Sequence, residues 1–411
     1  MFIYNKMSDA RIVLQATGEQ DEYLTKNANS TFFKKKFETY SDYGSNWIQL
    51  SNNDKGIDNF VMPGKSLYFR INQDGDLINE IYLKIKINKN DSWKKSNFSS
   101  YETILGIIDS IEFLYNSKIL SQFDSDFIFS YMELHYDEEY KRRISNLISY
   151  EKSLKESENS SISDDTISLY LPLPFWFHRN VGLSFPIWAL TDSNVGINIK
   201  LKNYDSTNRV IKDIELLTKF SYLNNEEKNK FKNSSLEYLI EQPERLEKIN
   251  IGSSSSIQRI SLLKSHYVRY LFWNIKNLSE NNWKKYNNFK YLDHLSKGTI
   301  KVNGNDLISE SDNKFFHLIN RYKFFNSNGT LYMGDNNGEI DISSLNPIYS
   351  YSFCLNPVDY KSSGFITTEK FNQFELTLEI NQGVGERELN IYSMKHNILR
   401  FNKGKLEILF N

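Results

Sequence analysis

The chain has 411 residues, and its 50 Lys and Arg residues nearly balance 51 Asp and Glu residues, for a formal net charge of −1. This balance argues against the strongly basic surface of proteins that bind nucleic acid directly. The length exceeds one ordinary hydrophobic core and predicts two domains of roughly 200 residues each.

The composition narrows the class further. The only cysteine is Cys354, so an intramolecular disulfide is impossible, which is typical of assembly in a reducing compartment such as the cytosol. No apolar run reaches the length of a membrane-spanning helix. Aromatic residues make up 15% of the chain, which favours pleated, half-buried strands.

The first half contains short runs typical of strands. In Glu80–Ile87, four apolar residues alternate with polar or aromatic ones, which predicts one buried face. Asn116-Ser117 separates two strand-like runs and predicts a hairpin. The predicted strands are Ser66–Arg70, Glu80–Ile87, Ser110–Tyr115, Lys118–Leu120, Thr166–Leu173 and Val195–Leu201.

Two segments break this pattern. Residues 124–148 carry apolar side chains at near-helical intervals, which predicts one or two inserted helices. Residues 224–235 are almost wholly polar and mark either an inter-domain linker or an early loop of the second half.

The second half resumes the strand pattern. Its candidates are Ile257–Leu263, Val268–Ile275, Gly298–Val302, Ile348–Leu355, Phe371–Ile380, Glu388–Lys395, Ile398–Phe401 and Lys405–Phe410. Each half thus offers roughly eight strands, the number found in a jelly-roll sandwich. We predict an all-β fold of two consecutive eight-stranded jelly-roll β-sandwiches with short inserted helices: an N-terminal arm at 1–24, a first roll at 25–215 with its helical insertion at about 124–148, and a second roll at 216–411.

The sequence offers no recognisable catalytic centre. None of the six histidines lies in a metalloprotease or nucleophile motif, and no Cys/His spacing resembles a zinc site. Gly383–Gly385 reads as a turn between strands, and the acids Asp137, Glu138 and Glu139 read as a solvated helix face. We therefore predict no enzyme activity, cofactor or metal site.

Seven segments in order resemble the major capsid proteins of nucleocytoplasmic large DNA viruses, the lineage of irido-, phycodna- and mimi-like viruses. The segments are Gly18–Phe37, Asn72–Leu83, Leu169–Leu190 (LYLPLPFWFHRNVGLSFPIWAL), Glu237–Glu247, Val302–Phe316, Tyr349–Ser363 and Asn390–Phe401. The motif residues that we single out are Asp21, Tyr23, Phe32, Phe33, Gly75, Asp76, Pro172, Phe175, Trp176, Phe177, Asn180, Gly182 and Pro186.

The resemblance implies a late structural protein of the virion, assembled in the host cytoplasm. Homotrimers would form pseudo-hexagonal capsomers that tile an icosahedral shell. The implied partners are neighbouring capsomers, minor capsid and penton proteins, and the inner membrane through the N-terminal region, without direct contact to nucleic acid.

Several alternatives remain open on the residues alone. The chain could be a minor capsid paralogue, an assembly scaffold of the same fold, or a carbohydrate-binding β-sandwich; no motif supports a jelly-roll hydrolase. Residues 21–37 read either as a first strand or as an interior segment that meets a membrane or minor capsid proteins. Pro172 and Pro174 place their segment at a sheet edge or leaving the sheet, where it either packs in the core or shapes a subunit contact.

Overall fold

The computed structural model describes most of the chain, which divides into two compact units, Met1–Asp42 and Tyr43–Asn411. The described residues are 12, 18–51, 61–88, 103–148, 166–191, 194–203, 211–262, 266–278, 292–325, 347–402 and 404–410, except residues 36, 234 and 384. In the first unit, helix α2 (Glu19–Thr25) precedes irregular residues. The interpretation of residues 21–37 as a first strand is therefore wrong, and the predicted end of the arm at residue 24 falls inside α2.

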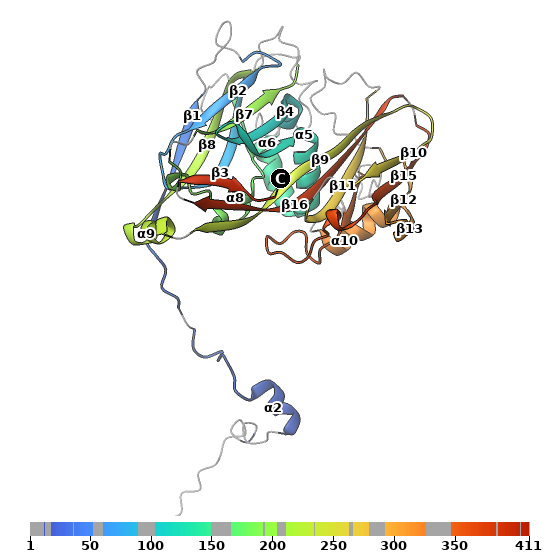
Figure 1. The fold of residues 1–411 in the computed structure, drawn as a ribbon. Coiled ribbons are helices and arrows are strands. Elements are labelled where there is room, and N and C mark those ends of the chain that lie inside the picture. Colours follow the sequence, from blue (N-terminus) through green and yellow to red (C-terminus); the bar gives the residue numbers. More distant parts are fainter. Residues whose placement is uncertain are drawn as a thin grey trace, which may run out of the picture. The chain divides into compact units, whose positions relative to one another are not determined.

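The first β-sandwich has two four-stranded antiparallel sheets (Figure 1). Sheet I contains, in spatial order, β1 (Tyr43–Ser51), β8 (Ile211–Leu223), β3 (Leu77–Asn88) and β6 (Thr166–Pro172). Sheet II contains β2 (Ser66–Ile71), β7 (Val195–Leu201), β4 (Ile108–Tyr115) and β5 (Lys118–Asp124). The boundary predicted at residues 215 and 216 lies within β8, which pairs with β1 and β3 of this sandwich.

Local sequence explains these strands. Along β3, Ile81, Leu83, Ile85 and Ile87 are buried while the intervening side chains are partly exposed, as the alternation predicts. The predicted hairpin joins β4 to β5, and Asn116 and Ser117 have positive φ angles of 47° and 68°. Both central residues of a type I′ turn need this conformation, which Asn tolerates better than most residues.

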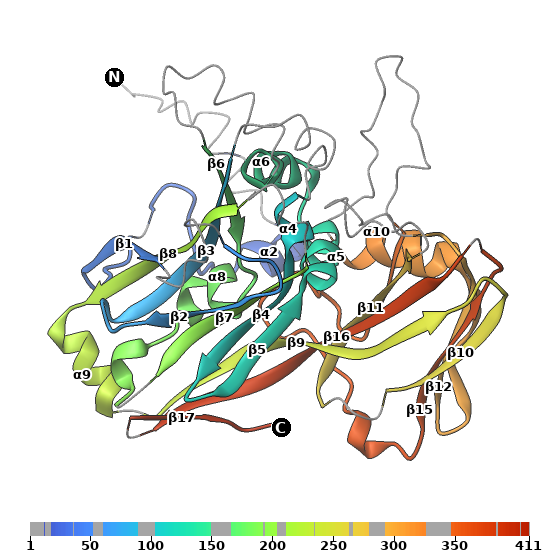
Figure 2. The ribbon, with the colours of Figure 1, turned by 90° about the horizontal axis from the view of Figure 1, so that it is seen from above.

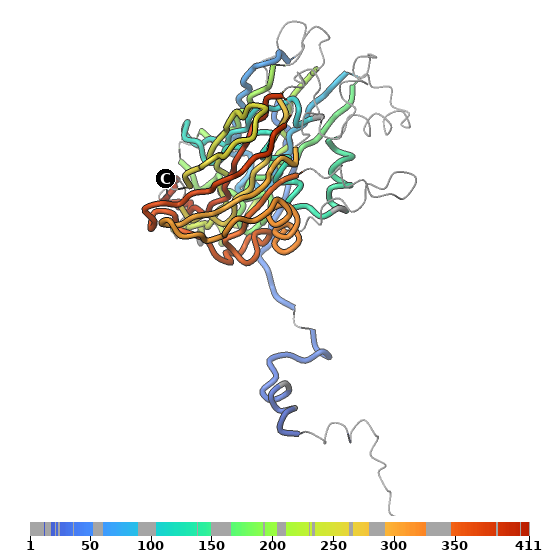
Figure 3. The backbone as a smooth tube through the Cα atoms, turned by 90° about the vertical axis from the view of Figure 1, so that its right-hand side faces the viewer, coloured from blue at the N-terminus to red at the C-terminus, as the bar shows by residue number. Residues whose placement is uncertain are grey.

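The second sandwich also has two sheets, whose strands appear in yellow to red in Figure 3. Sheet III contains β9 (Leu236–Ile251), β16 (Arg387–Asn402), β11 (Val268–Asn277) and β14 (Ile348–Ser352), and β17 (Lys405–Ile408) pairs with the end of β16. Sheet IV contains β10 (Ser256–Ser261), β15 (Phe374–Ile380), β12 (Leu295–Val302) and β13 (Asn305–Asp312).

The two sandwiches repeat one topology. Sheet I has the order β1-β8-β3-β6, and sheet III repeats it as β9-β16-β11-β14. Sheet II has the order β2-β7-β4-β5, and sheet IV repeats it as β10-β15-β12-β13. Each strand of the second sandwich except β17 therefore has a counterpart in the first, which confirms two consecutive jelly rolls with no visible repeat in the sequence.

Helices interrupt both rolls at the same place. After β5 come α5 (Ser125–His135) and α6 (Glu138–Ile148), which confirms the predicted helical insertion. After its counterpart β13 come the π-helix η6 (Phe315–Ile319) and α10 (Asn320–Phe324). An Asp caps each start: Asp124 accepts from the backbone N–H of Phe127 at 2.7 Å, and Asp312 from that of Phe315 at 3.0 Å.

The remaining described helices are short connections. These are α4 (Thr103–Ile107), α8 (Trp176–Arg179), η2 (Val181–Leu183), η3 (Ile187–Ala189), α9 (Asn225–Asn233) and η8 (Thr368–Lys370). The polar segment predicted as a linker or loop forms α9, between the last strand of the first roll and the first strand of the second. Gly383 and Gly385 lie in the connection between β15 and β16, as predicted.

Buried apolar residues form two clusters. One fills the space between sheets III and IV. The other fills the first roll and continues through α5 to the outer face of sheet III, where it includes Tyr270, Phe272 and Tyr392. Figure 2 shows α5 between β4 of the first roll and β11 of the second. The two rolls are therefore joined by a continuous apolar contact, which we call the roll seam.

Candidate assembly surfaces

Helix α5 forms the apolar centre of the roll seam. Every residue of the helix except Asp126 is buried. The ring of Phe127 lies with its centroid 5.6 Å from that of Phe272 and 5.7 Å from that of Tyr392, both on sheet III. A helix that is buried on all sides needs apolar residues around its whole circumference, which the sequence SDFIFSYMELH supplies.

Charged groups border the N-terminal end of α5. The Asp124 carboxylate caps the helix and accepts from Arg245 Nη1 at 2.8 Å and from the Tyr392 hydroxyl at 2.9 Å. Burial raises the pKa of Asp124, and the nearby Asp126 acts in the same direction. Lys276 Nζ lies 3.1 Å from Asp126. Burial opposes the charge of Lys276, but Asp126, together with Glu388 and Asp124, raises the lysine pKa.

Neutral hydrogen bonds continue the seam along the helix. Asn274 donates to the Ser130 hydroxyl at 3.1 Å, and His135 Nε2 lies 2.7 Å from the Tyr270 hydroxyl. All four side chains are buried. Because buried polar groups need partners, these contacts fix the position of α5 against sheet III more narrowly than apolar packing alone.

A carboxylate between two guanidinium groups forms a second contact across the rolls. Glu241 on β9 pairs with Arg179 on α8 of the first roll and with Arg269 on β11 of the second. Arg269 also donates to the carbonyl oxygen of Asp359 at 2.9 Å, and Arg179 donates to that of Val358. The Arg269 side chain is fully buried, so loss of Glu241 would leave a buried cation without its counter-charge.

Two histidines lie beside these arginines. Burial lowers the pKa of His135 well below its usual value, and Arg179 and Arg269 lower it further. Burial also lowers the pKa of His396 to about 4, assisted by the charge of Arg269. Both histidines are therefore neutral at neutral pH.

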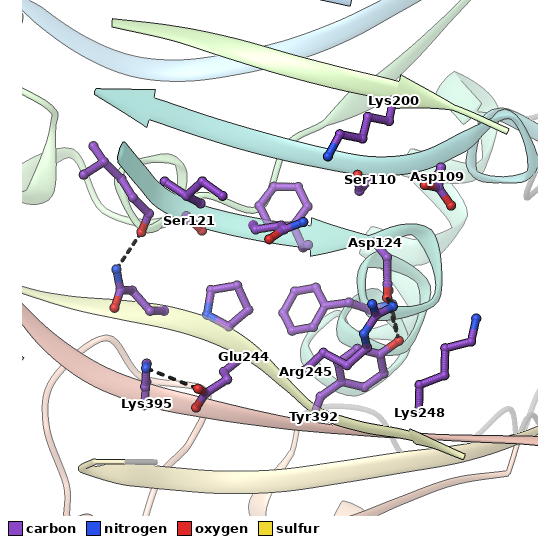
Figure 4. Close-up of a pocket in the computed structure, with 17 residues that line it drawn as sticks. Asp109, Ser110, Ser121, Asp124, Lys200, Glu244, Arg245, Lys248, Tyr392 and Lys395 are labelled. Carbon is purple, nitrogen blue, oxygen red and sulfur yellow. Dashed lines mark hydrogen bonds and ion pairs between the residues drawn. The ribbon is translucent and has the colours of Figure 1, made fainter. Parts of the chain in front are cut away.

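A groove of about 610 Å³ opens between sheet II and β9 (Figure 4). Its apolar lining includes Phe123, Phe127 and Tyr392. The cations that line it are matched by carboxylates: Lys200 with Glu112 at 2.5 Å, Arg245 with Asp124 at 2.8 Å, Lys248 with Glu388 at 2.9 Å and Lys395 with Glu244 at 3.6 Å. The groove is thus closely balanced in charge and lacks the unpaired cations that an anion site requires.

The motif residues Gly75 and Asp76 support the end of β8. A Cβ on Gly75 would lie 2.5 Å from the Cβ of Phe220, so only glycine fits there. Asp76 accepts from the backbone N–H of Leu223 at 2.8 Å and pairs with Lys228 of α9 at 2.8 Å. This carboxylate therefore ties the last strand of the first roll to the inter-roll helix.

The motif between residues 169 and 190 packs in the first roll. Pro172 ends β6, an edge strand of sheet I, as the prolines predict. Phe175, Trp176 and Phe177 are buried, and their ring centroids lie 5.3, 5.8 and 5.5 Å from that of Phe113. Core packing is thus one role of this segment.

The same segment also supplies Arg179 to the contact between the two rolls of one chain, and its role in a contact between subunits stays a prediction. The Asn180 side chain accepts from the backbone N–H of Gly182 at 2.9 Å and starts η2. Buried Pro186 precedes η3. These three residues shape the turn that follows Arg179.

The remaining motif residues lie in the N-terminal unit. Asp21 and Tyr23 are part of α2, and Tyr23, Phe32 and Phe33 are almost fully exposed. The structure therefore does not gather the singled-out residues into one site. Their roles as motif residues stay predictions.

Sequence reasoning missed the residues of the seam. Glu241, Arg179 and Arg269 are far apart in the chain. Arg179 and Glu241 lie in the motif segments Leu169–Leu190 and Glu237–Glu247, but nothing in these segments indicates that the charges meet. One signal was available in β11, where Val268–Asn277 (VRYLFWNIKN) is apolar over most of its length instead of alternating. Such a run is typical of a strand buried on both faces, and it predicts a cover on the outer face of sheet III.

Other surface features are limited. Among the described residues, no helix is both long and apolar enough to cross a membrane. Nor does that part of the chain gather three His, Cys, Asp or Glu side chains in an arrangement that could hold a metal ion.

Two family descriptions match consecutive parts of this chain. "Major capsid protein N-terminus" matches residues 31–234, and "Large eukaryotic DNA virus major capsid protein" matches residues 227–406. The chain belongs to the major capsid proteins of large eukaryotic DNA viruses. The two matches overlap at residues 227–234, and residues 227–233 of this overlap belong to α9, before β9, in agreement with the division between the rolls.

Relatives of similar length support this membership. The major capsid protein of Pyramimonas orientalis virus is 25% identical and aligns over 97% of this chain and 98% of its own length. That of Paramecium bursaria Chlorella virus 1 is 22% identical, with 95% and 97% covered.

Solved structures support the fold. A quasi-atomic model of the PBCV-1 virus capsid has a TM-score of 0.71 at 20% identity and covers 93% of this chain and 100% of that one. The Faustovirus major capsid protein has a TM-score of 0.67 at 10% identity, with 96% of each chain covered. The chain is a structural protein of the virion capsid, with the double jelly-roll fold.

Proposed function

We propose that three copies of this major capsid protein associate into a pseudo-hexagonal capsomer that tiles an icosahedral shell. The observation that supports this is the repeated strand order, because it gives each copy two similar rolls side by side. Three copies then supply six similar corners around one axis, and cyclic three-fold symmetry closes the ring. We divide the rolls at α9, with the first at 43–223 and the second at 236–411.

Purified full-length protein tests this proposal. Light scattering coupled to size exclusion should give a mass three times that of the 48.4 kDa chain. Negative-stain electron microscopy should show particles of hexagonal outline. A protein that stays monomeric at high concentration, or dimers with two-fold symmetry, would contradict the proposal.

The role that we propose is mechanical rather than catalytic. The capsomer would contact neighbouring capsomers, minor capsid proteins and penton proteins, with assembly in the host cytoplasm and no direct contact to nucleic acid. A minor capsid paralogue or a scaffold would share the fold but not the stoichiometry. Counting copies of the chain in purified particles separates these roles, because a main capsomer dominates the shell.

The N-terminal unit suits an attachment role. Phe32, Phe33 and Phe37 are almost fully exposed next to Lys34 and Lys35, a combination that favours an anionic membrane surface. We propose contact with the inner membrane through this region. Full-length protein should float with vesicles that contain phosphatidylserine, and a Phe32→Ser, Phe33→Ser double variant should remain in the soluble fraction. Equal flotation of both proteins would contradict this contact.

A further inference from the structure

Three strand segments of the second roll extend beyond it and cover part of the first roll. Residues 387–395 of β16 pair with β11, but residues 399–402 pair with β17 instead, while β9 follows β16 along nearly its whole length. The extension consists of residues 236–242, 397–402 and 405–408, which we call the closing strap. Figure 2 shows β17, in red, on the side of the molecule that the first roll occupies.

The inner face of the closing strap completes the apolar interior of the first roll. Ile240, Phe401 and Leu406 are buried and belong to the same apolar cluster as the strands of the first roll. The ring centroid of Phe401 lies 5.7 Å from that of Phe185, which in turn lies 5.2 Å from that of Phe113 on β4. Without the strap, this side of the first roll's interior would be open to water.

Polar contacts hold the closing strap in one position. The backbone N–H of Thr191, which follows η3 in the first roll, donates to the carbonyl oxygen of Gly404 at 3.0 Å. A Cβ on Gly404 would clash with the Thr191 hydroxyl, and its positive φ of 81° also favours glycine. Buried Asn397 donates to the Gln242 side chain at 2.7 Å and accepts from the backbone N–H of Phe410 at 3.1 Å. These bonds join the strands of the strap to one another and to the first roll.

We propose that the closing strap makes completion of the first roll depend on the second roll, so that an unfinished chain cannot offer a finished first roll to an assembling shell. Domains usually fold as they are synthesised, the N-terminal one first. Thr191 and Gly404 are 213 residues apart, and contacts of such separation form late because a long loop must close first. The first roll therefore stays open until β9, β16 and β17 are in place. This dependence lies within one chain and holds whether or not the proposed trimer forms.

Leu406→Ser tests the dependence, because it removes an apolar side chain that the second roll supplies to the first. Amide hydrogen exchange of the full-length protein should show the protection of β3 and β4 reduced by about 30-fold, whereas β12 and β15 of the second roll keep theirs. The matched control is Glu407→Ser on the same strand, where Glu407 is exposed, and it should leave both rolls unchanged. Equal losses in both rolls for Leu406→Ser, or no loss in either, would overturn the proposal.

The order of folding gives a second test that needs no variant. Pulsed hydrogen exchange during refolding of the wild-type protein from urea reports when each strand becomes protected. Strands β3 and β4 should gain protection together with β16 or after it. Protection of β3 and β4 while β16 still exchanges freely would overturn the proposal, even if Leu406→Ser fails to fold.

Discussion

The helices that follow β5 and β13 occupy equivalent positions in the two rolls, yet their surroundings differ. Both begin at an aspartate cap, and both carry Phe at the third position after it. Helix α5 is buried nearly throughout, whereas η6 and α10 expose Leu318, Ile319 and Tyr322. The topology thus sets where a helix lies, and a neighbouring roll determines how much of it is buried.

The sheets show the same difference. Sheet I exposes part of its outer face, so β3 alternates between buried and partly exposed residues. Sheet III is covered by α5, and nine of the ten residues of β11 are buried. The two rolls therefore share a strand order but differ in burial: the outer face of sheet III is covered within the chain, and that of sheet I is partly exposed.

The largest effect should come from the equivalent phenylalanines. Phe127→Ala removes a ring buried against Phe272 and Tyr392 and should lower the free energy of unfolding by about 4 kcal/mol. Phe315→Ala removes a partly buried ring and should cost about 1–2 kcal/mol in the isolated subunit. Urea denaturation of both variants measures the difference. Equal losses in the free energy of unfolding would show that the roll seam does not stabilise α5 more than η6 is stabilised by its own surroundings.

The paired arginines should give the next largest effect. Glu241→Gln leaves Arg179 and Arg269 without their carboxylate and should cost about 3–4 kcal/mol. The control is Glu237→Gln on the same strand, because Glu237 pairs with Arg400 at the surface and should contribute less than about 1 kcal/mol. If the two variants unfold at the same urea concentration, the buried cluster does not stabilise the seam.

The capping aspartates Asp124 and Asp312 allow a second comparison between α5 and η6. Asp124→Ala removes a cap and the contacts to Arg245 and Tyr392, and should cost about 2–3 kcal/mol. Asp312→Ala removes the equivalent cap and should cost about 1 kcal/mol. Thermal unfolding of the isolated subunit should therefore separate the variants. A larger loss of stability for Asp312→Ala than for Asp124→Ala would contradict the greater contribution of the contacts around α5.

Acid should weaken the seam through its neutral histidines. The folded-state pKa of His396 lies at about 4, below the ordinary value of about 6.5 in the unfolded chain. The unfolded chain therefore binds more protons between these values, so stability falls as the pH decreases from about 6.5 to 4. Relative to wild type, His396→Gln should remove about 2 kcal/mol of this loss. The free energy of unfolding of both proteins is measured between pH 4 and pH 6.5. If it falls equally for both as the pH decreases, His396 does not cause the loss of stability.

Sequence alone predicted the elements whose signals are local. The alternation in β3, the Asn116-Ser117 hairpin and the helical spacing after Asp124 all appear as expected. The contact between rolls was not predictable in this way. Glu241 and its two arginines come together only after β9, α8 and β11 have packed. The exposure of Leu318, Ile319 and Tyr322 is notable only in comparison with the buried helix α5. The resemblance of the motifs indicated the fold, but it did not indicate which surfaces the rolls share.

The most direct test of this account is a cryo-electron microscopy reconstruction of the purified assembly. We expect three copies around one axis, whose six similar jelly rolls give a hexagonal outline. An assembly of two copies related by a two-fold axis, or particles that contain a single copy, would contradict it.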